Sequence, residues 1–158
     1  MSIQVGDIVP NTTLTIMGSE GPENIMTDDL LKDKKVVLFA VPGAFTPGCS
    51  ITHLPGFVVH ADTIKAKSVD SIICTAVNDV FVMDAWGKAQ NAEALIMAAD
   101  GNGELATGLG LELDASGFGM GQRSKRYAMI VENGTVTYLG VDEKGIELSA
   151  ADAIIAEL

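Results

Sequence analysis

Apolar residues occur in short runs along this chain, and the length and spacing of the runs predict its strands. Residues 35–41 and 71–77 are continuous apolar runs bounded by polar or turn residues, which is typical of fully buried strands. Residues 12–16 alternate between polar and apolar, which predicts a short strand. A further apolar stretch at residues 94–98 predicts another strand.

Helical patterns occupy much of the remaining sequence. They cover residues 28–31, 47–67, 80–90, 103–109 and 149–158. In the second of these, Pro55-Gly56 is expected to kink or break the helix, because an interior proline removes a hydrogen bond. Ser149 is the expected N-cap of the last helix. In the third helix, the residues expected to share one face are Phe81, Val82, Ala85 and Trp86.

Turn signals separate these elements. Residues 18–24 and 114–122 are rich in turn-forming residues, and we expect both segments to be loops. Asn133-Gly134 lies between apolar runs at residues 127–131 and 135–141. This dipeptide between two such runs is a strong signal for a β-hairpin.

The order of the elements predicts the fold class. A βαβαβ succession, followed by a hairpin and a terminal helix, indicates an α/β domain with helices on both faces of a mixed sheet. The chain has 158 residues and no internal repeat, so we expect residues 1–158 to form a single domain. In open α/β sheets ligands bind beyond the carboxyl ends of strands, and the junction at residues 41–49 lies at such a place.

Charge and composition narrow the range of partners. The net charge is -11 and hydrophobic residues make up 47% of the chain. Nucleic acids and anionic membranes bind clustered Lys and Arg, so neither is an expected partner. The sequence shows no signal peptide and no run of about 18 apolar residues that would predict a transmembrane helix. Two cysteines, Cys49 and Cys74, do not make a disulfide framework, so we expect a cytoplasmic protein with free thiols.

Cys49 is the candidate nucleophile because of its place in a predicted helix. Thr46 suits the N-cap and Pro47 suits the first helical position, which makes Cys49 the third helical residue. Backbone N–H groups there lack partners within the helix, and the helix dipole is positive at this end. Both effects stabilise a thiolate. The sequence therefore predicts a reactive thiol.

A reactive thiolate also needs a positive charge close to it. Arg126 is the best candidate, because it begins an apolar strand and a charge at a strand end can face the edge where ligands bind. Arg123 and Lys125 are the nearby alternatives. Thr46 lies three residues before Cys49, on a neighbouring position of one helix face, and can hydrogen-bond a small polar substrate there.

The segment around Cys49 also carries a family signature. Pro42, Thr46 and Cys49 form the pattern Pro-x-x-x-Thr-x-x-Cys, which resembles the active-site signature of peroxiredoxins. The longer run from Val41 to Phe57 is similar to the type II, peroxiredoxin-five-like branch of that family. Further matches extend the resemblance over nearly the whole chain, at residues 77–79, 81–87, 99–101, 109–114 and 123–127.

The resemblance implies a thioredoxin-like fold and a peroxidase that reduces hydrogen peroxide and alkyl hydroperoxides. Cys49 would be the peroxidatic cysteine, which attacks a peroxide oxygen and becomes a sulfenic acid. Thr46 would hydrogen-bond the peroxide, and Pro42 would shield the sulfenate from water. Arg126 would stabilise the thiolate and the peroxide oxygens, and His53 occupies a position from which relatives orient that arginine. This chemistry requires no metal, haem or flavin cofactor.

The return of the sulfenic acid to the thiol depends on another thiol. Some relatives carry a resolving cysteine near the C-terminus, but residues 147–150 contain none. Cys74 lies in a predicted strand and is expected to be an inert core residue. The resemblance therefore implies a one-cysteine mechanism, with glutathione and glutaredoxin, or thioredoxin, as the reductant. It also implies a homodimer.

Other cysteine chemistries fit the sequence less well. A cysteine phosphatase needs an arginine six residues after the cysteine, where this chain has Pro55. A cysteine protease needs a histidine base that faces the thiol, but His53 and His60 lie on the same helical segment as Cys49. A zinc site lacks the usual paired ligand spacing. A thiol redox sensor or holdase stays open as an alternative, and it would stop after one equivalent of peroxide.

Overall fold

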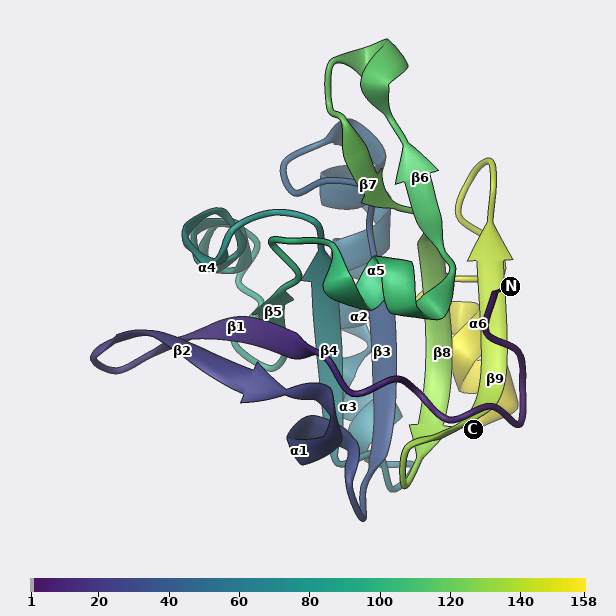
Figure 1. The fold of residues 1–158 in the computed structure, drawn as a ribbon. Coiled ribbons are helices and arrows are strands. Elements are labelled where there is room, and N and C mark those ends of the chain that lie inside the picture. Colours follow the sequence, from purple (N-terminus) through teal and green to yellow (C-terminus); the bar gives the residue numbers. More distant parts are fainter. Residues whose placement is uncertain (1) are drawn as a thin grey trace.

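A mixed seven-stranded sheet forms the centre of the molecule (Figure 1). The computed structural model describes residues 2–158. The strands of this sheet are β1 (Thr13–Gly18), β2 (Gly21–Met26), β3 (Lys35–Ala40), β4 (Ser71–Ala76), β5 (Ile96–Ala99), β8 (Arg126–Glu132) and β9 (Thr135–Asp142). Their order is β2-β1-β5-β4-β3-β8-β9. Neighbours among β3, β4 and β5 are parallel, and the other pairs are antiparallel.

Helices lie against both faces of the sheet (Figure 1). They are α1 (Thr27–Leu31), the π-helical turn η1 (Cys49–His53), α2 (Leu54–Val59), α3 (Ala61–Lys65), α4 (Val80–Ala89), α5 (Glu104–Leu109), the 3₁₀ turn η2 (Ser116–Phe118) and α6 (Ala151–Glu157). Leu30 of α1 and Leu105 of α5 belong to one buried cluster. Phe57 of α2, Trp86 of α4 and Ile154 of α6 belong to a second. The predicted α/β layering is confirmed.

Both faces of β3 are covered, which explains its uninterrupted apolar sequence. Val37 and Phe39 belong to the cluster beneath α2 and α6, whereas Val36 and Leu38 belong to the cluster beneath α1 and α5. All four are buried, so a polar residue at any of these four positions would carry a cost. The predictions of buried strands at β3 and β4 are confirmed. The β8–β9 hairpin with its turn at Asn133-Gly134 is confirmed as well.

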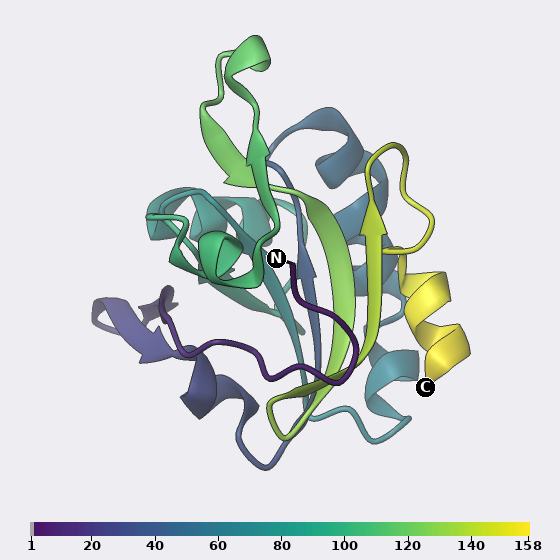
Figure 2. The same cartoon turned by 45° about the vertical axis from the view of Figure 1, so that its right-hand side comes forward.

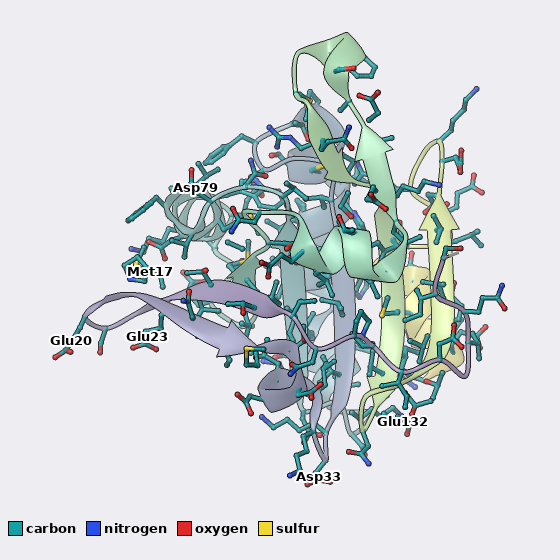
Figure 3. The ribbon with its side chains drawn as sticks, viewed as in Figure 1. Met17, Glu20, Glu23, Asp33, Asp79 and Glu132 are labelled. Atoms are coloured by element: carbon teal, nitrogen blue, oxygen red, sulfur yellow. The ribbon has the colours of Figure 1, made fainter. Side chains whose placement is uncertain are left out.

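β2 lies where residues 18–24 were expected to form a loop. The strand pairs with β1 along its whole length, although glycine, proline and asparagine are poor strand formers. Pro22 is tolerated because β2 is at the edge of the sheet, where one side needs no hydrogen-bond donor. Pairing with β1 therefore outweighs local preference. Figure 3 shows Glu20 and Glu23 on this hairpin, at the periphery of the molecule.

The helix that begins at Pro47 is not interrupted at Pro55-Gly56, contrary to the prediction. In η1 the Leu54 N–H donates to the Cys49 carbonyl, one residue further back than in an α-helix. Such a wide turn leaves room for the proline ring and makes no use of the missing N–H. The break comes instead at His60, between α2 and α3, where φ is -95° and ψ is 7°.

α4 buries a different face from the one predicted. Its buried residues are Val80, Met83, Trp86 and Gly87. Phe81, which was expected to share a face with Trp86, is 63% exposed. The buried positions follow a spacing of three and four residues, and Gly87 allows close contact with the sheet, because a Cβ there would lie 2.7 Å from Met97 Cγ. Of the four residues predicted to share this face, Trp86 alone is buried.

A two-stranded hairpin stands out from the body of the protein (Figure 2). It consists of β6 (Glu112–Asp114) and β7 (Gln122–Ser124), with η2 between them. The predicted loop at residues 114–122 is therefore partly a hairpin. Met120, between η2 and β7, approaches the loop that precedes Cys49, since a Cβ on Gly43 would lie 2.9 Å from Met120 Cε. Asp33 and Glu132 lie at the opposite end of the sheet (Figure 3).

Helices in this fold are short. Within residues 2–158 none combines the length and the apolar character that crossing a bilayer demands. That residues 1–158 form a single domain stays a prediction.

Candidate active site

Cys49 lies in the first turns of the helix that follows β3. The helix begins at Pro47, and the Thr46 carbonyl accepts its first hydrogen bond, from the Ser50 N–H at 2.9 Å. Thr46 therefore occupies the N-cap position, as predicted. Its hydroxyl donates to the Gly43 carbonyl at 2.6 Å, which holds the loop before the helix. Cys49 itself is fully buried.

Arg126 is the positive charge that meets the sulfur. Its Nη2 donates to Cys49 Sγ at 3.1 Å. β8 runs antiparallel to β3 and pairs Tyr127 with Ala40. This register carries Arg126 to the carboxyl end of β3, where the segment that holds Cys49 begins. A guanidinium in this place stabilises a thiolate and any negative charge that develops on a nearby oxygen.

His53 holds the other side of the same guanidinium. Arg126 Nη1 donates to His53 Nδ1 at 2.8 Å, and His53 Nε2 donates to the Ser149 carbonyl at 2.8 Å. Arginine only donates and a carbonyl only accepts, so the ring is neutral with its proton on Nε2. Burial lowers the pKa of His53 to about 4, although the bond to Ser149 opposes the change. The rings of Phe39 and Phe57 flank the imidazole.

Ser149 is not the N-cap that the sequence predicted. Ala150 takes that position before α6. The Ser149 hydroxyl donates to Asp142 Oδ2 at 2.7 Å instead. Ser149 is fully buried, and an ionised carboxylate within reach is a stronger acceptor for its hydroxyl than any neutral group.

A cavity of about 330 Å³ lies beside the segment that holds Cys49. Its lining includes Pro42, Gly48, Leu113, Arg126 and Ile146. Gly48 keeps part of this space open, because a Cβ there would lie 3.5 Å from Arg126 Nη2 and 3.9 Å from Ile146 Cδ1. A small molecule in the cavity can contact the guanidinium that bonds the sulfur.

The structure separates Arg126 from the alternative cations. Arg123 Nε donates to the Met120 carbonyl at 2.9 Å. Lys125 Nζ pairs with Glu143 at 3.5 Å. Neither side chain is hydrogen-bonded to the sulfur, whereas Arg126 is. The choice of Arg126 as the cation beside the thiol therefore agrees with the geometry.

The second cysteine, Cys74, is buried in β4, where it pairs in register with Phe39 of β3. Burial raises the pKa of the Cys74 thiol well above its ordinary value, and the proximity of Cys49 adds to the change. A thiol that stays protonated is a poor nucleophile. These properties are those of the inert core residue that the sequence predicted.

Sequence reasoning missed one contact beside the nucleophile. Trp86 Nε1 donates to Ser50 Oγ at 2.9 Å, which ties α4 to the turn that carries Cys49. The ring of Phe45 lies 6.5 Å from that of Trp86. No local pattern indicates the bond, because its partners are 36 positions apart.

Among residues 2–158 no three His, Cys, Asp or Glu side chains gather in a group that could hold a metal ion.

Comparisons with known proteins identify the family. The family model described as Redoxin matches residues 4–155. Peroxiredoxin-2D from Arabidopsis thaliana is 43% identical over 159 residues, which cover 99% of this chain and 98% of the relative. The chain belongs to the peroxiredoxin family. Peroxiredoxin-2C from Oryza sativa subsp. japonica is likewise 43% identical, over 160 residues that cover 99% of this peroxiredoxin and 98% of the relative.

Solved structures of peroxiredoxins superpose closely on this one. A reduced Prx3 from Vibrio vulnificus, in complex with hydrogen peroxide, matches with a TM-score of 0.95 and 53% identity over 98% of both chains. Peroxiredoxin 5 from Alvinella pompejana matches with a TM-score of 0.86 and 33% identity over 98% of this chain and 96% of that one. The fold is therefore thioredoxin-like, as predicted, and the protein is a thiol-dependent peroxidase with an antioxidant function.

Proposed function

We propose that this peroxiredoxin reduces hydrogen peroxide and alkyl hydroperoxides through a sulfenic acid on Cys49. The hydrogen bond from Arg126 to Cys49 carries the proposal, because it sets a permanent positive charge against a thiol at a helix start. The Thr46 hydroxyl donates its proton to the Gly43 carbonyl, so the hydroxyl oxygen can still accept a hydrogen bond from a peroxide O–H. Pro42 lines the adjacent cavity and shields the oxidised sulfur from water.

In the first step the Cys49 thiolate attacks one peroxide oxygen in line with the O–O bond. An S–O bond forms as the O–O bond breaks, and the departing oxygen takes the electron pair as hydroxide or alkoxide. Arg126 stabilises that developing negative charge. A proton from solvent completes water or an alcohol. The sulfur has lost two electrons to the peroxide and remains as a sulfenic acid.

We propose a one-cysteine cycle for the return step. A first external thiol attacks the Cys49 sulfenic acid to form a mixed disulfide and water, and a second thiol releases reduced Cys49 and an external disulfide. The burial of Cys74 supports this route, because a buried, protonated thiol is poorly suited to resolve the sulfenic acid. The proposed reductants are glutathione with glutaredoxin, or thioredoxin. Both cysteines are free thiols, which supports a reducing, cytoplasmic location.

A homodimer that pairs near the active site is part of this proposal. Phe45 is 54% exposed, Phe81 is 63% exposed and Phe118 is 86% exposed. Aromatic residues are enriched at protein–protein interfaces, so these exposed rings support a paired surface. Phe45 lies against Trp86 of α4, the helix that also carries Phe81. Sedimentation of the wild type and of a Phe45→Ser, Phe81→Ser variant tests the dimer, which the two changes should dissociate.

Peroxide consumption tests the proposed function. We expect Cys49→Ser to abolish turnover of hydrogen peroxide, and the matched variant Cys74→Ser to retain it. Each protein is assayed with glutathione plus glutaredoxin and, separately, with thioredoxin and its reductase. Sustained turnover by Cys74→Ser with either system supports the one-cysteine cycle. A single burst in every system contradicts the peroxidase cycle and favours a redox sensor. Turnover that requires Cys74 contradicts the one-cysteine step.

A further inference from the structure

Asp142 stands directly opposite Arg126 in the pairing of β8 with β9. Opposite charges at directly paired positions of a sheet normally attract each other. Yet of the ion pairs among the residues that the structure describes, none joins these two side chains. The carboxylate of Asp142 is instead engaged by the loop that follows β9.

Four hydrogen bonds connect the Asp142 carboxylate to this loop. Oδ2 accepts from the Glu147 N–H at 2.9 Å, from the Ser149 N–H at 2.8 Å and from the Ser149 hydroxyl at 2.7 Å. Oδ1 accepts from the Leu148 N–H at 3.1 Å. Burial alone would raise the pKa of Asp142, but these bonds hold it below its ordinary value. An ionised carboxylate therefore fixes the backbone of residues 147–149.

Ser149 carries this constraint to the active site. Its carbonyl accepts from His53 Nε2 at 2.8 Å, which leaves Nδ1 as the acceptor for Arg126. Arg126 in turn donates to Cys49 Sγ. Hydrogen bonds thus connect Asp142 to Ser149, Ser149 to His53, His53 to Arg126, and Arg126 to the sulfur of Cys49. In each of these bonds the donor and the acceptor are defined.

We propose that Asp142 is a positioning residue for Cys49: its carboxylate fixes the Ser149 carbonyl, and with it the tautomer of His53 and the direction in which Arg126 donates. The contribution of Asp142 to peroxide reduction rests on the proposed function, whereas its effect on the Cys49 thiolate does not. The titratable or charged groups near Cys49 include Arg126, His53 and Cys74, and Lys125 and Glu143 line the cavity beside it together with Asp142.

Removal of the Asp142 charge should change the stability of the Cys49 thiolate in opposite directions, depending on whether Asp142 acts by positioning Arg126 or by direct charge repulsion. Asp142 carries a negative charge and lines the cavity that Gly48 and Arg126 also line. Its removal by Asp142→Asn would therefore favour the thiolate if the charge acted only through space. If Asp142 acts through Ser149 and His53, the same variant loosens Arg126 and disfavours the thiolate. The asparagine also turns an NH₂ group toward backbone N–H donors, which cannot accept from it.

The test compares the rate at which iodoacetamide alkylates Cys49 in Asp142→Asn and in Glu143→Gln, below neutral pH. Both proteins carry Cys74→Ser, so that one thiol remains. Glu143→Gln is the matched control, since it removes the same charge one residue away, from a side chain that is 78% exposed. We expect alkylation to slow by about tenfold in Asp142→Asn, because a loosened Arg126 leaves less of Cys49 as the reactive thiolate, and to stay equal or rise slightly in Glu143→Gln. An equal or faster rate in Asp142→Asn overturns the proposal.

Two further measurements keep the proposal testable if Asp142→Asn is unstable. Ser149→Ala removes one of the four bonds and should slow alkylation less, in the same direction. Nitrogen chemical shifts of His53 should report the Nε2–H tautomer in the wild type and a mixture in the variants. In a His53→Leu background, Asp142→Asn should add no further slowing, and a full additional effect would contradict action through His53. Alkylation and tautomer are measured without peroxide, so the positioning role stands or falls apart from peroxidase turnover.

Discussion

Arg126 Nη2 lies 3.1 Å from Cys49 Sγ, while Nη1 of the same guanidinium donates to His53 at 2.8 Å. The neutral imidazole of His53 therefore holds one nitrogen of the guanidinium, and the other nitrogen donates to the sulfur. Lysine has the same charge but no rigid pair of donors, so it cannot reproduce both contacts.

Replacing Arg126 should slow the reaction of Cys49 with hydrogen peroxide. Arg126→Ala should lower the second-order rate constant by about 10²–10³, because a fixed donor to the developing charge is lost. Arg126→Lys should fall between that variant and the wild type. Rapid-mixing kinetics measure the rate constants. Arg123→Ala, which removes a guanidinium bonded to Met120 instead, serves as the control and should react like the wild type. A near-normal rate for Arg126→Ala rejects the role.

The buried, neutral state of His53 should make the fold sensitive to acid. The pKa of His53 is about 4 in the folded protein against an ordinary value of 6.5, so between these values the unfolded chain binds a proton that the folded protein does not. The free energy of unfolding should fall as the pH decreases from 6.5 toward 4, by roughly 3 kcal/mol from this group. Denaturant titrations across that range measure it.

His53→Leu is the variant that should lose this part of the pH dependence, whatever its stability at neutral pH. His60→Gln is the control, because His60 is partly exposed and pairs with Asp152 at the surface. The control should keep the slope. If His53→Leu and the wild type lose stability in parallel between pH 6.5 and 4, another group is responsible.

The bond between Trp86 and Ser50 should stabilise the turn that carries Cys49. Ser50→Ala leaves the buried Trp86 N–H without its partner, which should lower the free energy of unfolding by about 1–3 kcal/mol. Ser50→Thr keeps the hydroxyl and should cost less. The chain contains one tryptophan, so its fluorescence follows unfolding without interference. Equal stability of Ser50→Ala and the wild type would show that the bond contributes nothing.

A methyl group at position 48 should separate small from bulky peroxides. Gly48 has helical angles, so alanine fits the backbone, and its Cβ would stand between Arg126 and Ile146 at ordinary contact distances. Gly48→Ala should lower kcat/KM for cumene hydroperoxide by about tenfold and for hydrogen peroxide much less, because steric exclusion grows with substituent size.

Gly56→Ala is the matched control for that substitution. It adds the same methyl group to the same helix, where it would meet Ala151 Cβ at 3.9 Å and not the cavity. This variant should leave the preference between the two peroxides unchanged. An equal loss for both peroxides in Gly48→Ala would show that bulky substrates do not enter by this cavity.

Local patterns predicted most of the fold because burial on two faces leaves a simple signature. The run at β3 is apolar at every core position, and helix starts such as Pro47 are marked by residues with definite backbone preferences. The exceptions depend on distant partners. β2 exists because β1 pairs with it, and the helix passes Pro55 because η1 widens the turn before it.

The residues of the candidate site likewise include some that local sequence predicts and some that depend on distant partners. Cys49 and Thr46 could be predicted because helix capping is a local property, and Arg126 because a charge beginning an apolar strand is conspicuous. Asp142 and Ser149 could not, because their role is a set of hydrogen bonds across a loop. Ser149 before a helix resembles an N-cap in sequence, and only the position of the Asp142 carboxylate shows otherwise.

Mapping the sulfenic acid tests most directly whether Cys49 is the peroxidatic residue. The wild type and Cys74→Ser are treated with one equivalent of hydrogen peroxide in the presence of dimedone, and the labelled residue is located by mass spectrometry. We expect one dimedone adduct, on Cys49, formed at the same rate in both proteins, and none in Cys49→Ser. An adduct on Cys74, or peroxide consumption by Cys49→Ser at the wild-type rate, would contradict the assignment of Cys49 as the peroxidatic residue.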